Sequence, residues 1–250
     1  MIVHRSNRTE ELISELAGVV GAPGLGAFSK EVLVVQGRGM ERWLCMQLAD
    51  RLGIWANPDV LKPRGFLESV FNRVLESEIN PAYDSESLLW SIADLLPDLV
   101  ANDEFVSIRR YLAKDDDGRR RIQLSHQIAI TFDEYMAHRP EMMLKWLNAD
   151  RTEFDDRDEP WQAMLWRALT KRLGGNHLAG RAGALLDRLN RGPLPEGCLP
   201  QRVSIFGVSS LPRLYLDLYT ALSEHLELHL FILSPTREYW ADIATPHEVR

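Results

Sequence analysis

The sequence predicts an α/β fold in which a parallel sheet is interrupted by an all-helical insertion. Three observations lead to this prediction: two strand–loop–helix units occupy residues 1–65, the strand pattern disappears over residues 66–192, and it returns over residues 193–250. Strands that alternate with helices pair in parallel, because each helix carries the chain back to the start of the next strand. We therefore expect one sheet assembled from both ends of the chain.

The first two units are recognised from their apolar patterns. A short apolar strand begins at Ile2, the polar turn Arg5–Arg8 follows it, and apolar residues then recur at helical spacing over Leu12–Val20. After a break rich in glycine and proline, Val32–Val35 is typical of a strand buried in a parallel sheet. A helix with apolar inner residues over Met40–Leu52 completes the second unit.

The insertion keeps helical spacing in one segment after another, which predicts about six helices. The expected breaks between these helices are Pro81, Pro97, Asp115–Gly118, Pro140, Glu153–Glu159 and Gly174–Gly175.

The α/β pattern resumes after the insertion. Val203–Val208 is predicted to be a strand, and Leu226–Leu233 a further one. Between them, Ser209 and Ser210 are suited to cap a helix that begins at Pro212.

Composition places the chain among folded globular proteins, with 45% hydrophobic and 26% charged residues in 250. No apolar run is long enough to cross a bilayer and no signal peptide is apparent, so we expect a cytosolic chain without membrane contact. Cys45 and Cys198 have no CxxC or histidine-rich surroundings, so we expect two buried small side chains rather than a disulfide or a zinc site.

The net charge of −7 argues against a surface that coats nucleic acid throughout, because phosphate binding depends on clustered lysine and arginine. A local basic channel stays compatible with this charge. The clusters that could contribute to one are Arg5 with Arg8, Arg38 with Arg42, Arg109 with Arg110, and Arg119 to Arg121.

A glycine-bearing loop between a strand and a helix can bind phosphate through its free N–H groups, and Gln36–Arg42 has this form. A working nucleotide loop also needs a lysine followed by serine or threonine, and neither follows Gly37 or Gly39. We therefore interpret Gln36–Arg42 as a candidate surface for reading DNA rather than as a phosphate loop.

The other two parts of an ATP site are missing as well. The loop after the first strand places Ser6, Asn7 and Arg8 where the nucleotide would bind, without any glycine to let the backbone approach a triphosphate. The strand that ends in Phe206–Ser210 supplies no acidic residue for magnesium. We predict a degenerate nucleotide site, no catalytic residue, no metal ligand and no cofactor in this chain.

Ten short motifs follow one another in a defined order. They are His4–Arg8 (HRSNR), Val34–Leu44 (VVQGRGMERWL), Gly53–Asn57 (GIWAN), Gln123–Ser125, Phe132–Tyr135, Arg139–Pro140, Trp161–Trp166, Phe206–Pro212, Leu228–Leu230 and Tyr239–Trp240. Together they resemble the N-terminal part of the gamma subunit of exodeoxyribonuclease V, the RecC family. The resemblance covers nearly the whole chain, and the order and spacing of the motifs make it specific.

The resemblance implies a helicase-like core of the P-loop NTPase type that carries an inserted helical subdomain and has lost its ATPase activity. Family members are much longer than 250 residues, so the chain is expected to be an N-terminal fragment. In the family this bacterial, cytoplasmic subunit holds the beta and alpha subunits together, helps to split duplex DNA, and guides the single-stranded 3′ tail through a tunnel in which the Chi sequence is recognised. ATP and magnesium are used by the partner subunits.

The same resemblance points to candidate DNA contacts. They are Gln36, Arg38 and Arg42 in the loop and helix after the second strand, and Asp133, Glu134, Arg139 and Arg181 in the insertion. Arg38 and Arg42 stand where well-known members have smaller or uncharged polar groups, and Lys62 and Glu68 replace apolar residues, so the resemblance does not extend to recognition of the same hotspot sequence. Arginine can pair with guanine, glutamine with adenine and aspartate with cytosine.

Plainer interpretations of these side chains remain open. Gln36 can satisfy loop backbone, Asp133 can pair with a neighbouring arginine, and Arg139 can cap a helix end. Trp55 is either a platform for a DNA base or part of the core.

Three alternative functions also remain open. The acidic runs Asp115–Asp117 and Asp155–Glu159 could belong to a metal-dependent nuclease, although adjacent carboxylates between helices are more typical of solvated loops. The chain could be a divergent active ATPase. It could also be an interaction scaffold without DNA contact, in keeping with its acidic net charge.

Overall fold

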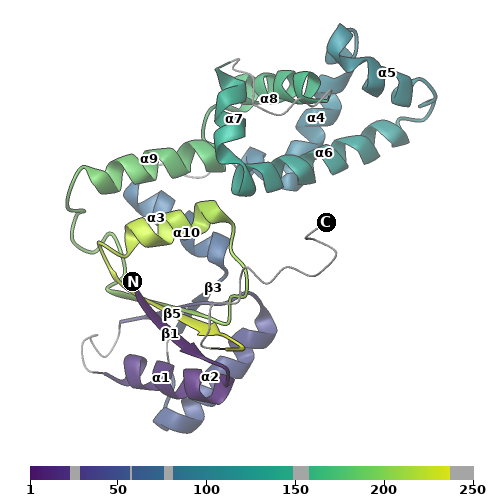
Figure 1. Ribbon diagram of the computed structural model, residues 1–250. Coiled ribbons are helices and arrows are strands. Elements are labelled where there is room, and N and C mark those ends of the chain that lie inside the picture. The colour runs from purple at the N-terminus through teal and green to yellow at the C-terminus, as the bar shows by residue number, and fades with distance from the viewer. Residues whose placement is uncertain (23–28, 57, 76–80, 149–157, 237–250) are drawn as a thin grey trace. The chain divides into compact units, whose positions relative to one another are not determined.

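The computed structural model describes residues 1–22, 29–56, 58–75, 81–148 and 158–236. The chain divides into two compact units: the first consists of Met1–Val70, Pro193–Leu211 and Tyr219–Arg250, and the second of Phe71–Gly192 and Pro212–Leu218. The first unit is thus built from segments far apart in the sequence, which Figure 1 shows as purple and yellow-green ribbons packed together.

A five-stranded sheet forms the centre of the first unit. Its strands are β1 (Ile2–Ser6), β2 (Glu31–Val34), β3 (Pro58–Leu61), β4 (Arg202–Phe206) and β5 (Glu227–Leu233), in the order β1-β5-β4-β2-β3. All four pairings are parallel, which confirms the α/β class and the parallel sheet. The segments before and after the helical insertion meet where β2 pairs with β4, with Leu33 opposite Ser204.

Strand β3 was not predicted. Its sequence, Pro-Asp-Val-Leu, has only two adjacent apolar residues and begins with a proline, so no alternating pattern marks it. Proline is tolerated at the first residue of a strand and at a sheet edge, and β3 meets both conditions within the described residues.

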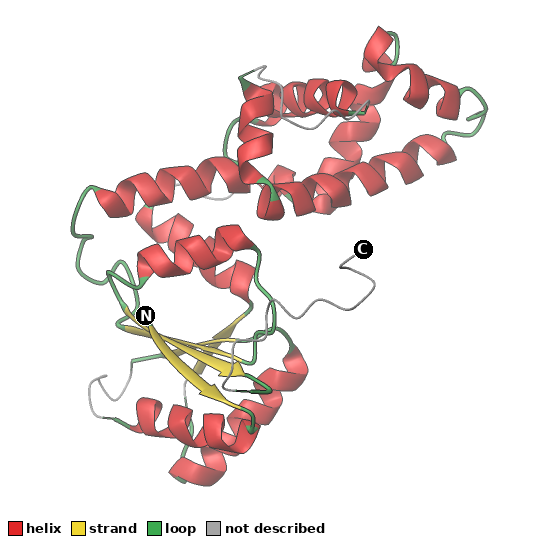
Figure 2. Ribbon diagram, in the orientation of Figure 1, coloured by secondary structure: helices red, strands yellow, loops and turns green. Residues whose placement is uncertain are grey.

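Helices cover both faces of this sheet (Figure 2). Helices α1 (Thr9–Gly21) and α2 (Arg38–Leu52) lie on one face, and α3 (Pro63–Val74) and α10 (Arg213–Leu222) lie on the other. Every residue of β2 is buried, as expected for a strand covered on both sides.

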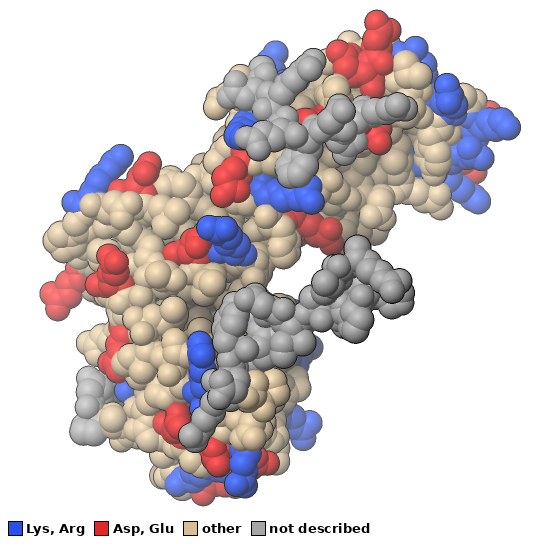
Figure 3. All heavy atoms as spheres, in the orientation of Figure 1, with Lys and Arg blue, Asp and Glu red and all other residues tan. Residues whose placement is uncertain are grey.

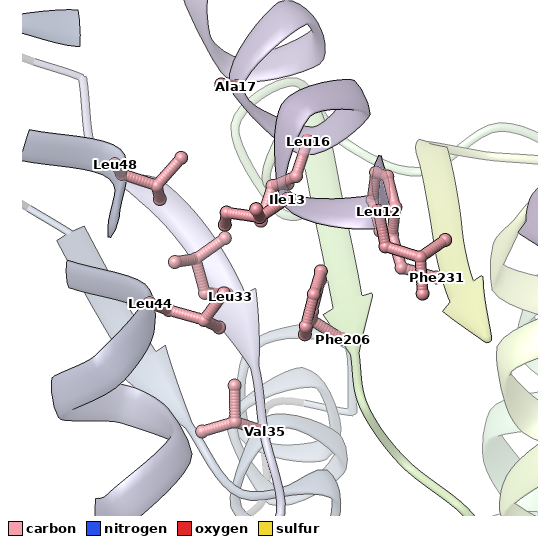
Figure 4. Close-up of a cluster of buried hydrophobic side chains, with 10 residues drawn as sticks. All are labelled: Leu12, Ile13, Leu16, Ala17, Leu33, Val35, Leu44, Leu48, Phe206 and Phe231. Atoms are coloured by element: carbon pink, nitrogen blue, oxygen red, sulfur yellow. The ribbon is translucent and has the colours of Figure 1, made fainter. Parts of the chain in front are cut away.

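The core between the sheet and α1 and α2 is apolar throughout (Figure 4). Successive strand residues point to opposite faces, so Leu33 and Val35 both reach α1 and α2. The cluster consists of Leu12, Ile13, Leu16, Ala17, Leu33, Val35, Leu44, Leu48, Phe206 and Phe231. Its side chains come from α1, β2, α2 and the ends of the distant strands β4 and β5, so this core requires both ends of the chain.

The second unit contains helices and loops but no strand among its described residues. Its elements are the short 3-10 helices η1 (Pro81–Tyr83) and η2 (Asp103–Phe105), and the helices α4 (Ser85–Leu99), α5 (Val106–Leu112), α6 (Arg119–His138), α7 (Pro140–Leu147), α8 (Glu159–Leu173) and α9 (Leu178–Asn190). Aromatic rings fill its core: Phe132 meets Trp166 edge to face with centroids 5.7 Å apart, and the Trp166 indole donates to the Met143 carbonyl.

Most of the expected helix breaks are confirmed, but one is wrong. Asp115–Gly118, Pro140 and Gly174–Gly175 fall at helix boundaries, whereas Pro97 lies inside α4. Because Pro97 lies only two residues from the end of α4, its missing N–H removes one hydrogen bond from the last turn and does not interrupt the helix. The acidic break Glu153–Glu159 lies mostly outside the described residues.

Two smaller expectations are also corrected. Helix α10 begins at Arg213 rather than at Pro212, and the amides of Tyr215 and Leu216 donate to the Pro212 carbonyl. Cys45 and Cys198 are not joined in a disulfide, and both are of intermediate exposure rather than fully buried. Within the described ranges, no helix has the length and apolar character that a bilayer crossing requires.

Candidate nucleic-acid interface

The carboxyl ends of β2 and β4 form a topological switch point in the sheet of the first unit. The two strands are neighbours, but the chain leaves β2 into α2 on one face and leaves β4 into α10 on the other. Open α/β sheets bind their ligands at such a point, where neighbouring connections turn to opposite faces. The residues that follow these two strands are therefore the first candidates for a binding site.

The loops after β2 and β4 hold each other at this point. The side-chain amide of Gln36, the second residue after β2, donates to the Ser210 carbonyl at 3.3 Å. Gly207, the first residue after β4, has a positive φ of 63°, and a Cβ there would lie 3.1 Å from the Met40 methyl group on α2. Gln36 itself is exposed, so its amide is held by the protein and still accessible from solvent.

Two exposed arginines stand beside Gln36 at the start of α2. Arg38 and Arg42 are four residues apart, which places them on the same face of the helix. Gly37 caps α2 without any side-chain hydrogen bond, and the N-terminus of a helix carries a partial positive charge. Arg38 and Arg42 outnumber Glu41, the acidic residue in the first turn, so this end of α2 favours anions although the whole chain is acidic.

The residues predicted to form a degenerate nucleotide site, Ser6 to Arg8, contact an acidic side chain instead. After β1, the Ser6 hydroxyl donates to Glu11 at 2.6 Å, and the Arg8 amide donates to the Ser6 oxygen at 3.1 Å. The Arg8 guanidinium lies 3.5 Å from the other Glu11 oxygen, and Asn7 between them is exposed. The Glu11 carboxylate therefore lies near the N-terminus of α1, where a phosphate would bind. A bound phosphate would need positive partners at this point and would meet a negative charge instead.

Three of the candidates from the second unit lie near the end of α6. Asp133 is half-buried, while Glu134 and Arg139 are exposed. Arg139 links α6 to α7: its amide donates to the Tyr135 carbonyl at 2.8 Å, and its guanidinium lies 5.7 Å from the centre of the Tyr135 ring. The helix-capping role considered for Arg139 is thus present, and its exposed charge remains at the same end of α6.

Arg181 lies in the interior of the second unit. Only 3% of it is exposed, its guanidinium donates to the Asn72 side chain at 3.0 Å, and it covers the Phe71 ring at 5.0 Å from the ring centre. This placement joins α9 to α3 and leaves Arg181 almost no surface on which DNA could lie. Its position is that of a packing residue.

Trp55 likewise has a packing position. It is half-buried against the apolar cluster of the first unit, and its indole nitrogen is buried.

The exposed candidates form two local groups. Gln36, Arg38 and Arg42 form one group in the first unit, and the end of α6 carries a second group.

The acidic runs serve helix ends in the described part of the chain. The Asp115 carboxylate accepts hydrogen bonds from the amides of Arg120 and Arg121, and Asp117 accepts one from the Arg119 amide. Asp158 accepts a hydrogen bond from the Trp161 indole, while residues 155–157 lie outside the described ranges. Within those ranges, no three metal-ligating side chains come together at one point.

The face drawn in Figure 3 shows basic and acidic groups interspersed rather than one continuous basic surface. On this face the pattern agrees with the net charge of −7 and favours local rather than extended contact with DNA. Sequence reasoning missed the contribution of the loop after β4, because no pattern in the sequence reveals that β4 pairs with β2.

Known proteins resemble this chain over almost its full length. It is 36% identical to the RecBCD enzyme subunit RecC of Escherichia coli over 98% of this chain and 22% of that protein. It is 30% identical to the RecBCD enzyme subunit RecC of Haemophilus influenzae over 97% of this chain and 24% of that protein. It is 27% identical to the subunit RecC of Mycolicibacterium smegmatis over 97% of this chain and 22% of that protein. The chain therefore spans less than a quarter of the length of these relatives. Residues 1–250 match the family described as "RecC, N-terminal domain", and the chain belongs to this family.

Proposed function

We propose that this chain is a non-catalytic, helicase-like DNA-binding domain of a gamma subunit of exodeoxyribonuclease V. In this proposal it acts in double-strand break repair and recombination within a RecBCD-type complex, where it guides the single-stranded 3′ tail at the duplex fork and recognises Chi-like sites. It also supports the beta and alpha subunits, which supply the ATP- and magnesium-dependent steps. Family membership and the names of the relatives support this assembly.

The loss of the ATP site is supported by the first unit alone. A helicase-like core would bind the nucleotide at the loop after β1, and there Ser6 and Arg8 already contact Glu11. A triphosphate would meet this carboxylate, and like charges repel at close range. The parallel sheet that resumes after a helical insertion is consistent with an inactivated helicase-like core.

The observation that carries DNA binding is the position of Gln36 beside Arg38 and Arg42 at the switch point. The Ser210 carbonyl orients the Gln36 amide before DNA binds. Binding of a base to this amide therefore loses less side-chain entropy than binding to an unrestrained glutamine would. A glutamine amide can pair with adenine, and an arginine can pair with guanine or with phosphate. The group can therefore both attract a strand and discriminate among bases.

The test is a titration of fluorescently labelled single-stranded DNA with the 250-residue chain, followed by anisotropy over a salt series. We expect Arg42→Gln to weaken binding to all sequences and to lower the slope of log affinity against log salt by about 0.7, the value for one phosphate contact on a single strand. We expect Gln36→Ala to change the preference among oligonucleotides of different sequence by about 5- to 100-fold, the range for one base contact.

Arg51→Gln is the matched control, because Arg51 is an exposed arginine at the other end of the same helix and donates only to Gln47 in the hydrogen bonds described. This variant should leave both affinity and salt slope unchanged. Equal losses in Arg51→Gln and Arg42→Gln would show that binding follows overall charge, and the proposed site at the start of α2 would then be wrong.

A further inference from the structure

A row of titratable side chains crosses the first unit away from the proposed DNA site. Glu15 on α1 contacts the Nδ1 atom of His4 on β1 at 2.8 Å. The Nε2 atom of His4 lies 3.0 Å from the Nδ1 atom of His229 on β5, and the Nε2 atom of His229 lies 2.8 Å from Glu227. These four side chains also line one cavity of about 580 Å³.

The number of protons in this row follows from its hydrogen bonds. An ionised carboxylate can only accept, so the outer nitrogen of each histidine must carry a hydrogen. A neutral imidazole has one N–H, so two neutral rings would turn unprotonated nitrogens toward each other at 3.0 Å. Two fully protonated rings would oppose two N–H groups. Only one additional proton, placed between His4 and His229, satisfies all three contacts.

The ring geometry favours a shared proton. The ring centroids are 5.3 Å apart and the planes differ by 26°, so the rings meet edge to edge and the facing nitrogens lie near both planes. The His4 ring stacks on Phe231 with centroids 4.3 Å apart and planes 9° apart, and an aromatic face stabilises a nearby cation. His229 is only 4% exposed and the His4 side chain 17%, whereas the outer carboxylates Glu15 and Glu227 are about half exposed.

The charged groups around the pair come from four elements. Glu15 of α1 and Glu227 of β5 face it directly, and Arg202 of β4 lines the same cavity. Arg202 makes two hydrogen bonds to Glu31 of β2 and also interacts electrostatically with Glu227. Glu15 and Glu227 are the two carboxylates that contact the histidines directly. An imidazole holds a proton far more strongly than a carboxylate, so the additional proton belongs to the histidines.

We propose that His4 and His229 share one proton and form a single partly buried cation that connects β1 and α1 to β5. Within the described residues β1 pairs only with β5, so this cation reinforces the attachment of an edge strand.

The first test is ¹⁵N NMR of the histidine rings in the 250-residue chain at neutral pH. We expect protonated outer nitrogens on His4 and His229, and two inner nitrogens with shifts between those of protonated and unprotonated imidazole. Two neutral rings with unprotonated inner nitrogens would overturn the proposal. A transition metal that copurifies in a one-to-one ratio and shifts these nitrogens would overturn it as well, because a metal would then occupy the place of the proton.

The second test counts protons by calorimetric unfolding slightly above neutral pH in buffers with different ionisation enthalpies. The wild-type chain should release about one more proton than the His4→Gln variant, because only the wild type holds the shared proton. His126→Gln is the control, since His126 is exposed on α6 in the other unit, and it should behave as wild type. Equal proton release by wild type and His4→Gln would contradict the shared proton. If His4→Gln does not fold, the NMR result on the wild type decides.

Discussion

Gln36 owes its position to a residue that is distant in the sequence. Its amide donates to the carbonyl of Ser210, and the loop that carries Ser210 is fixed by the close approach of Gly207 to Met40. The chemistry of Gln36 could be predicted from the sequence, because it follows a buried strand and precedes a helix. Its hydrogen-bond partner could not, because strand order depends on tertiary packing rather than on local pattern.

Substitution of Gly207 should therefore disturb the candidate site. In Gly207→Ala the new methyl group meets the Met40 methyl at 3.1 Å and the residue keeps a positive φ of 63°, so we expect a loss of about 1–2 kcal/mol in the free energy of unfolding. Urea denaturation measures this loss. Gly65→Ala is the matched control: Gly65 is helical with open space around its Cβ position, so its replacement should stabilise by up to about 1 kcal/mol. Equal effects in the two variants would exclude the contact with Met40.

For Arg181, the sequence did not reveal whether the side chain is exposed or buried. The resemblance made it a candidate DNA contact, but α9 turns its side chain inward to Asn72 and Phe71. An arginine in an amphipathic helix leaves its exposure undecided, because a long side chain can bury its stem or pair its charge internally. Gln36, Arg38 and Arg42 could be placed on an exposed loop and helix start because they follow directly on a buried strand.

Among the elements, strand β4 is tied to β2 by a buried ion pair at their starts. Arg202 donates to Glu31 through two nitrogens at 2.9 and 2.7 Å, and these hydrogen bonds raise the pKa of the guanidinium. Both side chains are about 8% exposed. The pair lies where the two ends of the chain join, so it helps to set the register between them.

Removal of one partner should cost more than removal of both. Arg202→Met leaves the Glu31 carboxylate buried without its partner, and we expect a loss of about 3–5 kcal/mol in the free energy of unfolding. The double variant Arg202→Met with Glu31→Met should recover most of that loss, because no uncompensated charge remains. A double-mutant cycle by urea denaturation measures the coupling. If the losses in the free energy of unfolding of the two single variants simply add in the double variant, Arg202 and Glu31 do not stabilise each other.

Helix α9 depends on a neutral histidine at its N-terminus. His177 caps it by accepting a hydrogen bond from the Gly180 amide at 3.1 Å, and burial lowers the pKa of His177 to about 4. Its ring also meets Trp166 edge to face at 5.0 Å, so protonation would place a charge inside the aromatic core. This cap could not be predicted from the sequence, since histidine is not among the common N-cap residues.

The cap makes the second unit sensitive to acid. In the unfolded chain His177 binds its proton at about pH 6.5, and in the folded chain only near pH 4. The stability that the neutral His177 contributes to the folded state is therefore complete above pH 6.5 and is lost as the pH falls toward 4. The loss should reach at most about 3 kcal/mol. His177→Asn keeps a capping side chain that does not titrate, and it should remove this part of the pH dependence. Stability measured between pH 4 and 7 checks the prediction, and an unchanged profile in the variant would refute it.

For the whole molecule, the two ends of the chain complete one sheet and the middle forms a separate helical unit. Short apolar runs, together with their alternation with helices, were sufficient to predict four of the five strands and their parallel arrangement. It could not predict β3, whose short edge sequence has no alternation, or the pairing of β2 with β4 across about 170 residues.

The proposed loss of the ATP site can be tested on the whole chain. A nucleotide that binds the folded state at one hundred times its Kd adds about 2.7 kcal/mol to stability and raises the Tm. Because Ser6 and Arg8 contact Glu11 at the loop after β1, we expect no rise in Tm with millimolar magnesium and ATP. Differential scanning calorimetry gives the answer, and a Tm that climbs with ATP concentration would restore the ATPase alternative.

The pairing of β1 with β5 also has a consequence for synthesis of the protein. Ser6 is opposite Leu233, so the first strand cannot find its partner until almost the whole described chain has left the ribosome. At typical translation speeds of about 5–20 residues per second, the apolar residues of β1 wait roughly 10 to 50 s for their neighbour. During this interval Ile2 and Val3 belong to an unpaired strand that other chains could bind. We therefore expect nascent chains interrupted before β5 to aggregate or to require a chaperone.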